Sequence, residues 1–168
     1  GGGERVYLQA LAPHAMMRDI DFSFLPAPPS EGAGVLGRLW VSAPGTLSPL
    51  HYDAQDSYLC QVRGAKRLLL WPASSLEDLQ PYPRDHPLAR RLRVDVTADE
   101  SPREHLETLS DEERERLCAP FAVTLEPGDV LYFPANWAHH TEALLPLPGE
   151  TVEPSFSLGF RTDGQFLL

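Results

Sequence analysis

The chain has 168 residues, of which 42% are apolar, and its formal net charge is -10. This length and composition fit one compact soluble domain with its own hydrophobic core. No run reaches the roughly 18 apolar residues of a membrane span, and no basic and then apolar leader opens the chain, so we expect neither a membrane anchor nor a signal peptide.

The acidic balance also bears on partners. It provides no overall positive field for nucleic acid, so a nucleic-acid partner is possible only through a local basic patch, for which Arg90, Arg91 and Arg93 lie close together. A basic peptide partner is compatible with the negative charge, although the need for solubility is the better explanation of it. We expect a protein or peptide substrate.

Two cysteines, Cys60 and Cys118, are too few for a disulfide framework. Cys60 lies in an apolar, strand-like run, which favours a reduced, buried thiol over a bridge or a nucleophile. Reduced thiols point to a reducing compartment. We therefore expect a cytoplasmic protein, or a nuclear one in a eukaryote.

The first half of the chain is divided into short segments by proline and glycine, which number 17 and 12 in the whole chain. Many short segments are typical of a β-sandwich or β-barrel. Residues 4–11 are expected to form a short helix or a strand, whereas the prolines of 22–34 forbid regular pairing there. The strands expected next are 35–43, a strand that begins at 48–53 and continues through 57–62, and 67–71, with turns at Pro44–Gly45 and Gly64.

The middle of the chain, about residues 72–119, is polar, charged and rich in proline. Its segment 101–117 has the chemistry of a helix. Ser101 can cap this helix, Pro102 suits its first turn, and Glu104 completes a capping box. Its charges indicate a solvated face rather than a site. We interpret the middle region as an insertion between two halves of a barrel, so that the whole chain is one domain.

Strands resume at 121–125 and 130–133, and the last one is expected at 156–160. Pro127 and Gly128 occupy the two central positions of a type II turn between the first two of these strands, because proline fixes φ and glycine accepts a positive φ. The elements together predict a mainly β fold.

His51 and Asp53 form the motif that carries chemistry. Residues two apart on a strand point to the same face, so an imidazole and a carboxylate project into one space. A distant histidine would complete the facial triad of non-haem Fe(II) oxygenases, in which two histidines and one carboxylate leave coordination positions open. The tripeptide alone is a weak signal. His139 and His140 are the rival third ligands, and since adjacent strand residues face opposite ways, only one should bind.

With these residues in view, the chain resembles the JmjC/cupin-type Fe(II)- and 2-oxoglutarate-dependent oxygenases. The likeness is strongest to the asparaginyl hydroxylase of hypoxia-inducible factor and to the tRNA wybutosine hydroxylase. It covers nearly the whole chain in the family's order. The matching stretches are YLQ at 7–9, SPLHYD at 48–53, QVRGAKR at 61–67, PYP at 81–83, PGDVLYFP at 127–134 and WAHH at 137–140. The resemblance implies a double-stranded β-helix, the jelly roll of cupins, with a metal in one mouth of the barrel.

The resemblance also implies roles for single residues. The family's catalytic iron ligands correspond to His51, Asp53 and His139. The far carboxylate of 2-oxoglutarate is costly to bury without a partner. The family residues that pair with it correspond here to Lys66, Tyr7 and Ser48. Lys66 could instead be a solvated turn lysine, and Tyr7 a core aromatic.

Some positions depart from the family's pattern. Ser57 stands near the cosubstrate where many relatives have asparagine, Gly159 replaces another asparagine, and Arg161 lies near an aromatic position. The family's C-terminal dimerising helices are missing, so we expect a monomer or a homodimer formed through another surface. His14, His86 and His105 are expected at the surface, and Trp137 is the tryptophan expected to line the site.

The implied activity is that of a dioxygenase that uses Fe(II) and 2-oxoglutarate to hydroxylate a C–H bond. A protein side chain is the favoured substrate. Hydroxylation of a tRNA base comes second, because the chain is acidic, and lysine demethylation comes third. The alternative of another class is a non-catalytic, metal-binding cupin, which would have no need of Lys66, Tyr7 and Ser48.

Overall fold

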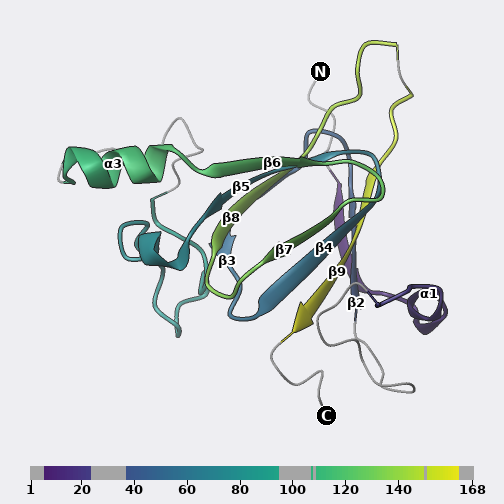
Figure 1. Ribbon diagram of the computed structural model, residues 1–168, viewed down its shortest axis with the longest axis horizontal. Coiled ribbons are helices and arrows are strands. Elements are labelled where there is room, and N and C mark those ends of the chain that lie inside the picture. The colour runs from purple at the N-terminus through teal and green to yellow at the C-terminus, as the bar shows by residue number, and fades with distance from the viewer. Residues whose placement is uncertain (1–5, 24–36, 95–106, 108, 150, 163–168) are drawn as a thin grey trace.

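A computed structural model describes residues 6–23, 37–94, 107, 109–149 and 151–162. Within these ranges the chain forms two antiparallel sheets (Figure 1). The five-stranded sheet has the order β1 (Tyr7–Leu11), β2 (Gly37–Ser42), β9 (Ser155–Thr162), β4 (Asp56–Arg63) and β7 (Val130–Phe133). The four-stranded sheet has the order β3 (Leu47–Tyr52), β8 (Ala138–Ala143), β5 (Lys66–Trp71) and β6 (Phe121–Leu125). The predicted mainly β, jelly-roll fold is confirmed.

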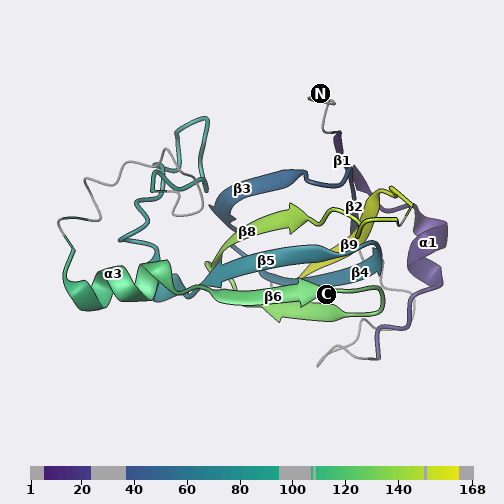
Figure 2. The ribbon, with the colours of Figure 1, turned by 90° about the horizontal axis from the view of Figure 1, so that it is seen from above.

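The helices lie at opposite ends of the sheets. Helix α1 (His14–Arg18) lies beside β1 and β2, whereas α3 (Asp111–Cys118) extends beyond the strands at the other end (Figures 1 and 2). A short 3-10 helix, η1 (Ala73–Ser75), follows β5. No helix in the described ranges is long and apolar enough to cross a membrane.

The core between the sheets is built by strands with alternating burial. On β5, Lys66, Leu68 and Leu70 are buried, whereas Arg67 between them is exposed. This period of two is what a strand with one inward face requires. Leu68 and Leu70 pack with Phe133 of the opposite sheet. The same alternation therefore places the Lys66 ammonium inside the molecule.

The middle of the chain packs against the end of the four-stranded sheet. Leu79, Leu92 and Leu117 of this region form a buried cluster with Leu50, Trp71 and Ala138 of β3, β5 and β8. The indole N–H of Trp71 donates to the Leu117 carbonyl at 2.7 Å. Complete burial of one such leucine contributes about 1.5–3 kcal/mol. The described part of the middle region is thus anchored to the strands that carry the site. That residues 72–119 are an insertion within a single domain stays a prediction.

Most expected strands are confirmed, but the one expected to run from 48 through 62 is wrong. The chain forms β3, turns after Tyr52, and then forms β4 in the other sheet. The turn is held by the Asp53 carbonyl, which accepts a hydrogen bond from the Asn136 amide at 2.7 Å. The predicted type II turn is present: Gly128 has φ 101° and the Asp129 amide donates to the Glu126 carbonyl at 3.0 Å.

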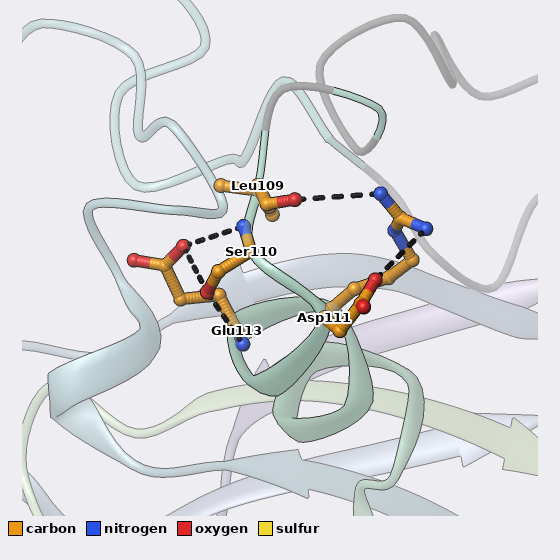
Figure 3. A network of polar contacts seen from close by, with 5 residues as sticks. Leu109, Ser110, Asp111 and Glu113 are labelled. Carbon is orange, nitrogen blue, oxygen red and sulfur yellow. Dashed lines mark hydrogen bonds and ion pairs between the residues drawn. The ribbon is translucent and has the colours of Figure 1, made fainter.

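The helix expected over 101–117 is also corrected. Glu107 is helical, Leu109 and Ser110 are not, and α3 begins at Asp111, so the expected helix is interrupted. The Ser110 hydroxyl accepts from the Glu113 amide, while the Glu113 carboxylate accepts from the Ser110 amide (Figure 3). These two residues form a capping box for α3. The capping box expected at Ser101 lies outside the described residues, as does most of the loop expected at 22–34.

Candidate metal centre

The three predicted ligands lie together at one end of β3 and β8. His51 is on β3, Asp53 follows that strand, and His139 is on β8 directly opposite His51 in the register. One ligand atom from each lies within 4.8 Å of the others. An ion bound at about 2 Å from each atom fits this spacing after a small contraction. His140, whose neighbour across the sheet is Leu69, is not in this group.

The two imidazoles are oriented by backbone carbonyls. His51 Nδ1 donates to the Pro49 carbonyl at 2.8 Å, and His139 Nδ1 donates to the Trp137 carbonyl at 3.1 Å. A carbonyl can only accept, so this hydrogen bond fixes the proton on Nδ1 and leaves the Nε2 lone pair for a metal. Such outer contacts orient histidine ligands and raise their basicity.

A cavity of about 370 Å³ lies between the sheets and contains this group. All seven residues that the sequence nominated for the site line it, namely Tyr7, Ser48, His51, Asp53, Ser57, Lys66 and His139. Tyr7 is 44% exposed, so it is not a core aromatic. Ser57 is buried, and its hydroxyl donates to the Gln55 carbonyl at 3.4 Å.

Lys66 and Thr46 are buried polar groups of the cavity wall without a partner among the described residues. Lys66 is 4% exposed and forms no ion pair, and burial lowers the pKa of its ammonium to about 8. The Thr46 hydroxyl is buried and makes no hydrogen bond to any residue that the structure describes. Buried, unpaired polar groups are costly and usually have a partner. Both groups therefore fit an anionic ligand, and the alternative of a solvated Lys66 is wrong. Thr46 was missed from sequence.

Residues 5–157 match the family described as the Cupin-like domain. The chain belongs to this family. It is similar to Jumonji C domain-containing protein 5 of Drosophila melanogaster, with 32% identity over 126 residues, 73% of this chain and 26% of that protein. It is similar to Lysine-specific demethylase 8 of Xenopus tropicalis, with 31% identity over 121 residues, 72% of this chain and 24% of that protein.

A third relative is tRNA wybutosine-synthesizing protein 4 of Neurospora crassa, with 30% identity over 150 residues, 82% of this chain and 12% of that protein. This Cupin-like domain chain thus spans about a quarter or less of the length of these curated relatives. The predicted membership of the JmjC/cupin group is confirmed.

Two arginines of the middle region contact the ligand strand of the cupin-like fold. Arg90 lies with its guanidinium 3.5 Å from the Asp53 carboxylate, and its carbonyl accepts from the Tyr52 amide at 3.0 Å. Arg91 donates to the same Pro49 carbonyl that orients His51, at 3.1 Å. The sequence had suggested only a basic patch here, so the positions of these arginines near the candidate metal ligands were missed.

Trp40, rather than Trp137, lines the cupin-like cavity. Trp137 packs with the cluster around Leu68 and lies outside the described cavity wall, so the expectation for it is wrong. A Cβ at Gly159 would overlap the Trp40 ring. The tryptophan therefore occupies the space into which a larger residue at 159 would extend. The side chain of Arg161 lies outside the described part of the structure.

Proposed function

We propose that the chain is an Fe(II)- and 2-oxoglutarate-dependent dioxygenase that hydroxylates a C–H bond of a protein side chain. One observation carries the proposal: a single cavity contains both a His-Asp-His group and a buried ammonium that has no partner among the described residues. A metal site alone would need only the first of these features.

His51, Asp53 and His139 would hold the iron. Two nitrogens and one carboxylate oxygen suit Fe(II), and three protein ligands leave coordination positions open, which is the donor set of the non-haem oxygenases. Together with 2-oxoglutarate and O₂, the bound iron supplies the oxidation that replaces C–H by C–OH, while the oxo acid becomes succinate and CO₂.

Lys66 would bind the far carboxylate of 2-oxoglutarate. Its ammonium offers three donors, and a charge-assisted hydrogen bond to a carboxylate is stronger than a neutral one. Thr46 and Ser48 offer hydroxyl donors from the same cavity wall, as does Tyr7. A carboxylate would in turn offset the burial of Lys66.

Apolar side chains exclude water next to the ligand group. The Phe133 ring lies 4.7 Å from the His139 ring, and fully buried Leu68 lines the same cavity. A dry wall strengthens the electrostatic contacts inside the site and limits side reactions. The chain's contribution is therefore binding, orientation and exclusion of solvent, which is the usual division of labour with a cofactor.

The relatives support an oxygenase but do not select a substrate. Their printed names include a lysine-specific demethylase and a tRNA wybutosine-synthesizing protein, so they differ in what they act on. We retain hydroxylation of a protein side chain as the proposal for this chain.

The test is turnover and binding by the purified chain. With Fe(II), ascorbate and 2-oxoglutarate, we expect binding of 2-oxoglutarate and slow release of succinate, faster with substrate. If the chain binds Fe(II) but neither binds 2-oxoglutarate nor releases succinate with any peptide, it is a metal-binding cupin and the proposal is wrong.

A further inference from the structure

The cavity is cationic although the chain is acidic. Among the residues that the structure describes, the lysines and arginines that line it are Arg38, Lys66, Arg90 and Arg91, whereas Asp53 is the one acidic residue of the lining. Solubility accounts for a negative net charge, but it does not account for cations that gather in one cavity. We therefore infer the charge of the ligand from the cavity, and we assign the negative net charge to the outer surface.

The cofactors do not account for the three arginines. This inference rests on the proposed function, which places Fe(II) and 2-oxoglutarate in the cavity. The two charges of a ferrous ion and the Lys66 ammonium cancel the charge of Asp53 and the two carboxylates of 2-oxoglutarate. Arg38, Arg90 and Arg91 are left uncompensated, so the loaded cavity keeps a positive field.

These arginines have donors to spare. Arg90 is about half exposed and makes one long ion pair, and Arg91 uses one nitrogen for the Pro49 carbonyl. Arg38 of β2 is exposed, and its side chain has no hydrogen bond or ion pair within the described residues. A guanidinium carries five N–H donors and binds a carboxylate through two of them at once. The free donors suit a carboxylate-bearing ligand.

The negative charge outside the cavity favours a short acidic peptide over a nucleic acid as the anionic ligand. A nucleic acid extends far beyond one cavity and would meet the acidic outer surface, and its binding needs many cations along its path. A cationic lysine or arginine side chain would face three guanidiniums and no carboxylate of the lining except Asp53. A short acidic segment needs only the local cations.

We propose that the mouth of the cavity binds an acidic peptide segment of the substrate, whose aspartate or glutamate side chains pair with Arg38 in the field of Arg90 and Arg91. The hydroxylated side chain then belongs to a protein with acidic residues beside the target.

The test is peptide binding to the chain saturated with 2-oxoglutarate and with Mn(II), which replaces Fe(II) so that turnover does not occur. Three fluorescent peptides differ only in carrying aspartates, asparagines or lysines at the same positions, and single-stranded RNA is the fourth probe. We expect the aspartate peptide to bind tightest and to weaken as salt is added.

Arg38→Gln should weaken the aspartate peptide about tenfold, the effect of losing one charge-assisted contact. Arg67→Gln is the matched control, because Arg67 is an exposed strand arginine outside the cavity lining, and it should leave binding unchanged. The inference is overturned if the lysine or asparagine peptide binds as tightly as the aspartate peptide, or if RNA binds more tightly than the aspartate peptide. It is also overturned if Arg38→Gln and Arg67→Gln lose the same amount of affinity for the aspartate peptide.

A titration of 2-oxoglutarate alone separates the two proposals. If the oxo acid does not bind, the proposed function fails and this inference fails with it. If the oxo acid binds but the aspartate peptide does not, only this inference fails.

Discussion

Lys66 is the residue on which the assignment of the cosubstrate depends. It is buried on an inward position of β5, and no anionic partner lies among the described residues. The substitution Lys66→Met keeps much of the side-chain length and removes the charge. We expect it to weaken 2-oxoglutarate binding by about tenfold to a hundredfold, since a charged hydrogen bond is lost, while metal affinity changes little.

The control for this prediction is Arg67→Met, one position along the same strand but exposed. It should change neither affinity. Calorimetric titrations of 2-oxoglutarate and of Mn(II) into each variant provide the comparison. Equal losses of both affinities in Lys66→Met would mean that the variant is misfolded or that Lys66 has another role.

The pKa of Lys66 makes a prediction about pH. Burial lowers this pKa from 10.5 to about 8, so the folded chain releases the proton before the unfolded chain does. Between about pH 8 and pH 10.5 the unfolded state binds more protons, and this residue's contribution to folding stability therefore rises with pH. Binding of 2-oxoglutarate has the opposite dependence, because it requires the charged ammonium.

We therefore expect 2-oxoglutarate affinity to fall as the pH rises above about 8. Lys66→Met should bind weakly at every pH and show no such fall. The measurement is a series of binding titrations from neutral to alkaline pH at constant ionic strength. A wild-type affinity that is flat across this range would show that Lys66 does not bind the oxo acid.

At the scale of elements, the segment around Arg90 and Arg91 contacts the end of β3, next to the candidate metal ligands His51 and Asp53. Arg90 has a positive φ of 70°, which is uncommon for a residue with a side chain and is held here by the Tyr52 amide. Arg90→Gln should weaken metal binding about tenfold, as is typical when an outer contact to a ligand is lost. The Co(II) absorption spectrum should also change, which a purely structural role would not cause.

Arg93→Gln is the control, since Arg93 lies in the same segment but packs over Tyr82, with 5.2 Å between its guanidinium carbon and the ring centre. It should leave the metal affinity and the spectrum unchanged. Identical effects of the two substitutions would assign this segment a general role in stability only.

Elements differ in how far the sequence predicts them. The strand at 67–71 and the turn at Pro127–Gly128 are predicted by local signals, and both are confirmed. Strand β8 was not predicted, because its sequence AHHTEA has no apolar alternation and its pairing with β3 and β5 defines it. The metal group was predictable from spacing and resemblance. Thr46 and Arg90 were not, because tertiary packing alone brings them to the cavity.

At the scale of the whole molecule, two sheets enclose a cationic cavity within an acidic chain. The ligands come from β3 and β8, which are neighbours in one sheet, and from the turn that leads to the other sheet. The described middle region packs on the same end of the fold and contributes arginines to the cavity. The architecture thus brings together, from distant parts of the chain, a group that could hold a metal ion and the buried lysine proposed to bind the oxo acid.

The central claim is that His51, Asp53 and His139 bind a single metal ion. Titration with Co(II), followed by visible absorption, tests it with a matched pair of substitutions on β8. We predict one ion per chain, strong loss of binding in His139→Ala, and retained binding in His140→Ala, whose side chain is outside the ligand group. Retained binding in His139→Ala, or loss only in His140→Ala, would contradict the account.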